Sequence, residues 1–152
     1  MRDIFRAHVD TWKMEPVDHI LELSKELGAA RQVDAAIDAF IAGHYDVAIT
    51  LAGAAEGMLE DTNGEALFNK LLEHPKAREQ FSKKEWNSIL NTERDWLKHL
   101  TPDLPETIEI SLDEAAYMIA RAASKIAVWS DQMAEFRLWY IERVNARTGS
   151  SA

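Results

Sequence analysis

The residues best suited to chemistry lie in one stretch, Asn91–Leu100, whose sequence is NTERDWLKHL. Within it, Arg94 is followed directly by Asp95 and, five positions on, by His99. A guanidinium can hold a phosphate or stabilise the charge that develops on one during a reaction. A histidine donates or accepts a proton close to neutral pH. We therefore take Arg94, His99 and Asp95 as the candidate catalytic residues.

The end of the helix that carries this stretch should favour a protonated His99. Pro102 pushes the residue before it out of helical geometry, so His99 falls in the last turn, beside the negative end of the helix dipole. Asp95 lies one turn earlier on the same face and favours the same charge state. Both influences prepare His99 to transfer a proton near neutral pH.

The same spacing also fits a helix end without chemistry. With nine arginines and five histidines in 152 residues, about 0.3 Arg-x4-His matches are expected by chance. Asp95 and His99 would then be an exposed i,i+4 pair. On an ideal helix Arg94 and His99 point about 140° apart, so a shared site requires an unwound last turn or a second chain.

Three further residues are candidate binding groups: Asn91, Lys98 and, on the flank of an earlier helix, Glu56.

Two amphipathic helices precede this stretch. Ser24 is a predicted N-cap, and apolar residues recur every three or four positions from Leu27 to Ile41, ahead of Gly43. A second apolar face follows at once from Val47 onward. Because the connection at Gly43 is short, the two helices are expected to form an antiparallel hairpin.

Three capping boxes mark the starts of later helices. They pair a serine or threonine with a glutamate three residues on: Thr62 with Glu65, Ser82 with Glu85, and Ser111 with Glu114. The second box opens the helix that should run on through Asn91–Leu100, with an apolar core face made of Trp86, Ile89, Leu90, Leu97 and Leu100. Glu93 points close to that face, so either it requires a buried partner or the helix is turned relative to this assignment. The third box opens the longest helix, which Ser130–Asp131 bends or splits.

No segment alternates in the manner of a strand, so the chain is predicted to be an all-α, up-and-down bundle of about four or five helices. We divide it into an N-terminal arm (1–23), a helical domain (24–148) and a disordered tail (149–152). An aromatic stripe in the last helix is expected to be core or dimer interface. It consists of Trp129, Phe136, Trp139 and Tyr140.

Composition narrows the classes of function. The net charge of −9 disfavours broad, nonspecific binding of nucleic acid. The absence of cysteine excludes disulfides and thiolate metal sites, and we assign neither a metal nor a cofactor. The chain has no apparent signal peptide and no apolar run long enough for a bilayer, so a cytoplasmic protein without a membrane partner is expected.

Three patterns together resemble the HEPN superfamily over about residues 28–148. They are Ala36-x3-Phe40-x2-Gly43-x-Tyr45-x2-Ala48, then Ala54-Ala55-Glu56, and later Arg94-Asp95-x3-His99. That superfamily is known for an Arg-x4–6-His motif with a polar residue after the arginine, and Asp95 has that character.

The resemblance implies a homodimer in which two such motifs meet to form a metal-independent endoribonuclease site. His99 would then be the general acid/base for attack by the ribose 2′-hydroxyl, and Arg94 would stabilise the phosphorane-like charge. Many members of the superfamily are instead thought to be noncatalytic, which leaves open a module that binds a nucleotide, RNA or a partner protein.

Overall fold

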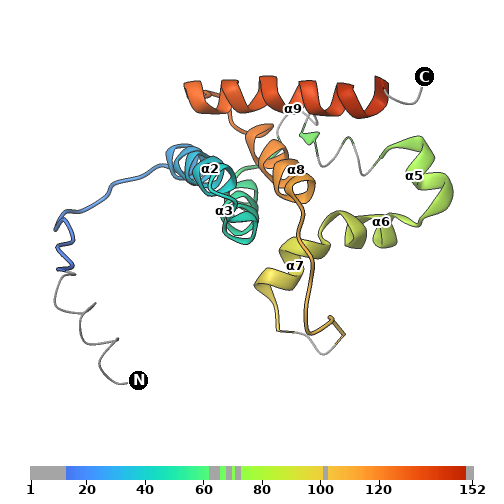
Figure 1. The fold of residues 1–152 in the computed structure, drawn as a ribbon, viewed down its shortest axis with the longest axis horizontal. Helices are drawn as coiled ribbons and strands as arrows, with labels where there is room; N and C mark the ends of the chain where they lie inside the picture. The colour runs from blue at the N-terminus through green and yellow to red at the C-terminus, as the bar shows by residue number, and fades with distance from the viewer. Residues whose placement is uncertain (1–12, 62–65, 68–69, 71–72, 101–102, 150–152) are drawn as a thin grey trace, which may run out of the picture.

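Seven helices are delimited in the part of the chain that the computed structural model describes, which comprises residues 13–61, 66–67, 70, 73–100 and 103–149 (Figure 1). No strand occurs within those ranges, so the all-α prediction is confirmed. The helices are α2 (Lys25–Ile41), α3 (Tyr45–Met58), α5 (Pro75–Gln80), α6 (Lys83–Leu90), α7 (Thr92–Lys98), α8 (Leu112–Ala123) and α9 (Asp131–Gly149). They outnumber the predicted four or five because two predicted helices are each divided in two and because α5 was not predicted.

Helices α2 and α3 form the predicted hairpin, and its turn depends on Gly43. This glycine has a φ of 80°, in the left-handed region that other residues rarely adopt. Its N–H donates to the carbonyl of Phe40 at 3.0 Å, and the N–H of His44 donates to that of Ala39 at 2.8 Å. This pair of hydrogen bonds is a Schellman motif, which satisfies the last carbonyls of α2 and reverses the chain.

The centre of the fold is a contact between α3 and its neighbours α2 and α8, made largely by alanine. Small side chains allow the helix axes to approach closely, so backbone and β-carbon atoms form much of the interface. The fully buried members include Ala29, Ala36, Ala48, Ala52, Ala115 and Ala116, with Val33, Ile49 and Ile119 between them. Three larger residues that periodicity places on the buried faces are exposed instead, and those assignments were wrong: Leu27, Ile41 and Val47.

Two of the three predicted capping boxes are confirmed. The Ser82 hydroxyl accepts from the N–H of Glu85 at 3.2 Å, and the Glu85 carboxylate accepts from the N–H of Ser82 at 3.0 Å, which starts α6. Ser111 and Glu114 make the same reciprocal pair at the start of α8. The box predicted at Thr62 lies outside the described residues.

The predicted continuous helix from Ser82 through Asn91–Leu100 is divided at Asn91 into α6 and α7. The Thr92 hydroxyl lies 3.0 Å from the carbonyl of Ser88 and 3.1 Å from that of Ile89. It therefore donates a hydrogen bond to the carbonyls at the end of α6. The change of direction also overturns part of the predicted core face. Ile89 is 45% exposed, and Leu100, beyond the end of α7, is fully exposed.

The predicted longest helix is likewise split, as the Ser130–Asp131 signal allowed. Helix α9 lies across one side of the bundle (Figure 1). Its Phe136 is buried and makes an edge contact with Phe40 of α2 at a centroid distance of 5.9 Å. Trp139 and Tyr140 both pack against the ring of Phe136, which places this part of the aromatic stripe in the core.

Residues 13–23 contain no helix and are exposed, and α2 begins directly after Ser24, whose hydroxyl accepts from the N–H of Leu27. Residues 1–12 and 150–152, which contain the rest of the predicted arm and most of the predicted tail, lie outside the described residues. Within the described chain, no helix combines the length and the apolar character needed to cross a bilayer.

Candidate functional site

Arg94 lies where α7 packs on α3, and a glycine makes room for it. A β-carbon added to Gly53 would lie 3.0 Å from both Cγ and Cδ of Arg94, closer than most such contacts allow. The side chain of Arg94 is 29% exposed, so its stem is covered by α3 while part of it remains accessible. Gly53 therefore lets the arginine lie against the surface of α3.

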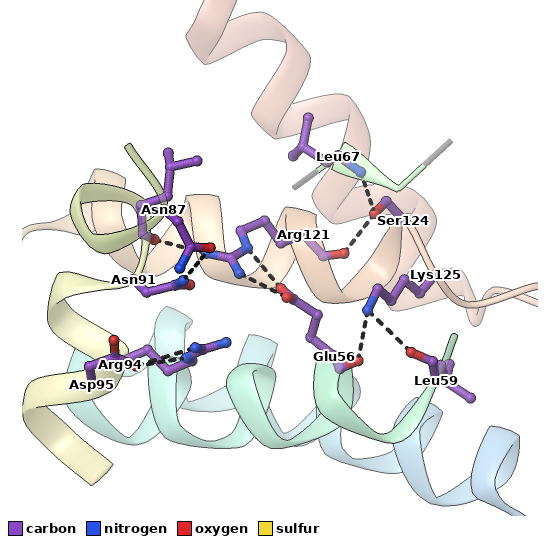
Figure 2. A network of polar contacts seen from close by, with 11 residues as sticks. Glu56, Leu59, Leu67, Asn87, Asn91, Arg94, Asp95, Arg121, Ser124 and Lys125 are labelled. Atoms are coloured by element: carbon purple, nitrogen blue, oxygen red, sulfur yellow. Dashed lines mark hydrogen bonds and ion pairs between the residues drawn. The ribbon is translucent and has the colours of Figure 1, made fainter. Parts of the chain in front are cut away.

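The guanidinium of Arg94 pairs with the carboxylate of the next residue. Nη2 and Nε of Arg94 donate to Oδ1 of Asp95 at 3.2 and 3.4 Å (Figure 2). The predicted partner of Asp95 was His99, but among the described residues these two side chains form neither a hydrogen bond nor an ion pair. The reason is that His99 is the C-cap of α7, with φ −123° and ψ 135°, so it has left the helix. Only its backbone N–H reaches Asp95, at the carbonyl oxygen.

His99 lies in an open hollow at the far end of α7. The hollow has a volume of about 560 Å³, and its lining includes Trp96, Lys98, Leu104 and Glu106. The indole N–H of Trp96 donates to the carbonyl of Pro105 at 2.7 Å, which holds the following loop against α7. His99 and Lys98 are both exposed there. The hollow thus presents an imidazole and an ammonium beside apolar side chains.

Arg94 does not line this hollow, so within one chain the two motif residues have different surroundings. Arg94 faces α3, whereas His99 faces the loop that follows α7. No arginine is among the described residues that line the hollow of His99.

Glu56, the third predicted binding residue, is buried and bound to an arginine that sequence reasoning missed. Arg121 Nε and Nη2 donate to Oε2 and Oε1 of Glu56, each at 2.8 Å (Figure 2). Arg121 Nη1 donates to the carbonyl of Leu90 at 2.8 Å. That carbonyl belongs to the last turn of α6, where helical partners run out. One guanidinium therefore joins α3, α8 and the α6–α7 joint.

A signal for Arg121 exists in the sequence. It is the only charged residue within Met118–Ala123, a run of otherwise apolar residues on an amphipathic helix. A charge in such a run requires a buried partner. Glu56 occupies a comparable place in the alanine-rich α3, so the two residues could have been matched on that ground.

Asn91, another predicted binding residue, is 4% exposed and lies in the α6–α7 joint. Its Nδ2 lies 3.4 Å from Oδ1 of Asn87, and its own Oδ1 is buried without a hydrogen-bond partner among the described residues. Its burial favours a role in holding the joint. Of the predicted binding residues, only Lys98 shares the hollow with His99.

Burial raises the pKa of two side chains, those of Glu93 and Tyr117. It raises the pKa of Glu93 above its usual value, and Glu114 adds to the rise by charge repulsion. The inward direction predicted for Glu93 is thus partly correct, although it is only half-buried. Burial also raises the pKa of Tyr117 to about 12, while the guanidinium of Arg121, 5.4 Å from the ring centre, opposes the rise.

Within the described residues, no cluster of three or more histidine, aspartate or glutamate side chains is arranged to hold a metal ion. Comparison of the chain with protein-family models, with curated proteins and with solved structures finds no match.

Proposed function

We propose that this chain is a HEPN-like helical domain that acts, as a homodimer, as a metal-independent endoribonuclease. The observation that carries the proposal is the place of His99. It lies exposed beyond the end of α7, in a hollow with apolar lining, and is followed by the fully exposed Leu100. An exposed leucine beside a hollow lined by both apolar and charged side chains is the kind of surface that another chain covers.

A second chain would also solve the problem of bringing the motif together. Arg94 and His99 lie in different surroundings within one chain, so Arg94 of the partner subunit would have to meet His99 across a twofold axis. A twofold interface is self-complementary, and two equivalent sites would result. Helix α7 is short and ends in solvent, which leaves its end accessible to such a contact.

The reaction follows from the two side chains. Neutral His99 takes the proton of a ribose 2′-hydroxyl, and the freed oxygen attacks the adjacent phosphorus. Arg94 stabilises the additional negative charge on the phosphoryl oxygens. The bond from phosphorus to the 5′-oxygen then breaks, and that oxygen takes a proton from solvent. The products are a 2′,3′-cyclic phosphate and a 5′-hydroxyl.

A noncatalytic binding module is the second candidate function, and one contact favours it. Asp95 already engages Nε and Nη2 of Arg94, which are the groups that a phosphoryl oxygen would use. In such a module Lys98 and His99 would bind a nucleotide, RNA or partner protein without turnover. Asp95→Ala separates the two functions, because it removes the acceptor of both hydrogen bonds and frees the guanidinium. A ribonuclease should then cleave RNA faster, whereas a noncatalytic module should leave RNA intact.

The proposal is tested by incubating the purified protein with mixed single-stranded RNA in the presence of a chelator. The wild type should leave 2′,3′-cyclic ends, and His99→Ala and Arg94→Ala should each lower the rate at least ~100-fold. His44→Ala is the matched control, because His44 is exposed and makes no side-chain capping bond at the start of α3. Intact RNA with the wild type would favour the noncatalytic module.

A further inference from the structure

Helices α5 and α6 carry a second surface that the proposed site does not use. A hollow of about 420 Å³ lies between them and is lined by His74, Lys76, Ala77, Gln80, Phe81 and Trp86. We call it the α5–α6 hollow. The rings of Phe81 and Trp86 are stacked in it, with centroids 5.7 Å apart and planes inclined by 9°. Both residues remain partly exposed.

Local packing explains why the rings touch. Phe81 precedes the N-cap Ser82, and Trp86 is the fourth residue of α6, so the two occupy the positions of a hydrophobic staple. A staple fixes the angle at which the chain enters the helix. It does not require the rings to line a hollow with a lysine and a histidine, as these two partly exposed rings do.

The charge around this hollow is opposite in sign to that of the whole chain. Residues 70–84 contain five basic and two acidic residues, a formal charge of +3, whereas the protein carries −9. Lys83 pairs with Glu73 at 3.1 Å. Neither Lys76 nor Lys84 forms an ion pair with any residue that the structure describes, and both are exposed. The local field therefore attracts an anion.

We propose that the α5–α6 hollow binds single-stranded RNA, with a base stacked on the Phe81–Trp86 pair and phosphates near Lys76 and Lys84. Stacked aromatic rings beside basic side chains are the combination with which proteins bind single strands, since every base has a flat face and every nucleotide a phosphate. The inference rests on the proposed function, because it assigns that function a single-stranded substrate held outside the cleavage site.

Position along the chain supports such a division of roles. Helices α5, α6 and α7 follow one another in Figure 1, from one edge of the view to the exposed end of α7. Along the chain α6 is followed directly by α7, whose C-cap is His99. The negative charge elsewhere on the protein would restrict a polyanion to this part of it.

The test measures binding separately from cleavage by using the His99→Ala protein, which should not cleave RNA. Binding of a labelled oligouridine of twelve nucleotides is followed by fluorescence anisotropy. Trp86→Leu keeps an apolar staple but removes the large ring, and should weaken binding by about 5- to 150-fold. Trp86→Tyr keeps an aromatic face and should bind within about threefold of the parent. Equal affinity of the Leu and Tyr variants would overturn the proposal.

Salt dependence tests the phosphate contacts. Lys76→Gln should lower the slope of log Kd against log salt by about 0.7, the value for one contact to a single strand. Lys25→Gln, at an exposed lysine in the first turn of α2, should leave it unchanged. An unchanged slope for Lys76→Gln would contradict the proposal. Equal displacement of oligouridine by polyglutamate would also contradict it and assign the hollow to an acidic peptide.

The two proposals fail in different ways. If the wild type leaves RNA intact but the anisotropy depends on Trp86 and Lys76, the binding site stands and the ribonuclease proposal is wrong. If the wild type cleaves RNA while both substitutions leave binding unchanged, the ribonuclease proposal stands and the α5–α6 hollow is not its RNA site.

Discussion

Glu56 and Arg121 are joined in the protein interior by two hydrogen bonds of 2.8 Å, and their side chains are 6% and 0% exposed. A bidentate pair of this kind fixes both direction and distance between α3 and α8. Through the carbonyl of Leu90 the same arginine holds the end of α6, next to the joint from which α7 departs. The pair thus sets the position of the helix that carries the candidate site, and it leads to the first prediction.

Removing one member of the buried pair should destabilise the protein strongly. Arg121→Met leaves the carboxylate of Glu56 buried without its cation, which should lower the free energy of unfolding by about 3–5 kcal/mol. Glu56→Gln combined with Arg121→Met removes both charges and should recover part of that loss. The measurement is urea unfolding followed by circular dichroism.

The exposed pair between Arg143 and Asp113 is the control. Their side chains are 38% and 36% exposed, and Arg143 Nε lies 2.9 Å from Asp113 Oδ1. Arg143→Met should cost much less than Arg121→Met, because solvent screens an exposed ion pair. If Arg121→Met cost no more than Arg143→Met, the structural role assigned to the buried pair would be wrong.

Two glycines of α3 should respond differently to alanine because only one of them faces Arg94. A β-carbon at Gly57 meets nothing within 4 Å, so Gly57→Ala should raise stability by up to about 1 kcal/mol through helix propensity. At Gly53 the same gain in helix propensity is offset, because the added β-carbon would lie 3.0 Å from Cγ and Cδ of Arg94 and the arginine must move. Gly53→Ala should therefore stabilise less and should lower RNA cleavage, whereas Gly57→Ala should leave cleavage unchanged. Equal behaviour of the two variants, measured by thermal unfolding and by the chelator assay, would refute this account of Arg94.

Acid should weaken the contribution of Asp113 to stability. Hydrogen bonding to the guanidinium of Arg143 holds the pKa of Asp113 below its usual 3.8, and Arg147 contributes in the same direction. The unfolded chain therefore binds a proton at higher pH than the folded chain. The contribution is complete above pH 3.8 and is lost as the pH falls through the lowered folded-state pKa. The difference in unfolding free energy between wild type and Asp113→Asn should shrink below pH 3.8, and growth of that difference in acid would contradict the prediction.

Glu93 should show the opposite sign. Burial raises its pKa above 4.5, so the folded chain holds a proton more tightly than the unfolded chain does. Its contribution to stability is complete below pH 4.5 and is lost as the pH rises through the raised folded-state pKa. Glu93→Gln should consequently be more stable than the wild type at pH 7 and should lose that advantage below pH 4.5. A variant that is less stable than the wild type at pH 7 would show that ionised Glu93 has a compensating partner.

Local signals in the sequence predicted the starts of three helices and the turn between α2 and α3. Ser24, Ser82 and Ser111 each start the helix expected of them, and Gly43 makes the expected turn. These features depend on hydrogen bonds between residues three to five positions apart, which a single sequence displays directly.

The candidate site depended on contacts that sequence spacing does not display. The break at Asn91 is held partly by Arg121, thirty-one residues beyond Leu90, and the pairing of Arg121 with Glu56 spans sixty-five residues. Once the break is made, an ideal helix no longer describes the directions of Ile89, His99 and Leu100. The residues of the motif were therefore identifiable, whereas their surroundings were not.

The central claim, that Arg94 and His99 of two different chains form one ribonuclease site, is tested most directly by mixing subunits. Arg94→Ala and His99→Ala proteins should each be inactive alone. After subunit exchange, about half of the dimers contain one of each chain and thus one intact site, so the mixture should regain about a quarter of wild-type cleavage, with 2′,3′-cyclic ends. A mixture of folded, exchanged chains that remains as inactive as its components would contradict the claim.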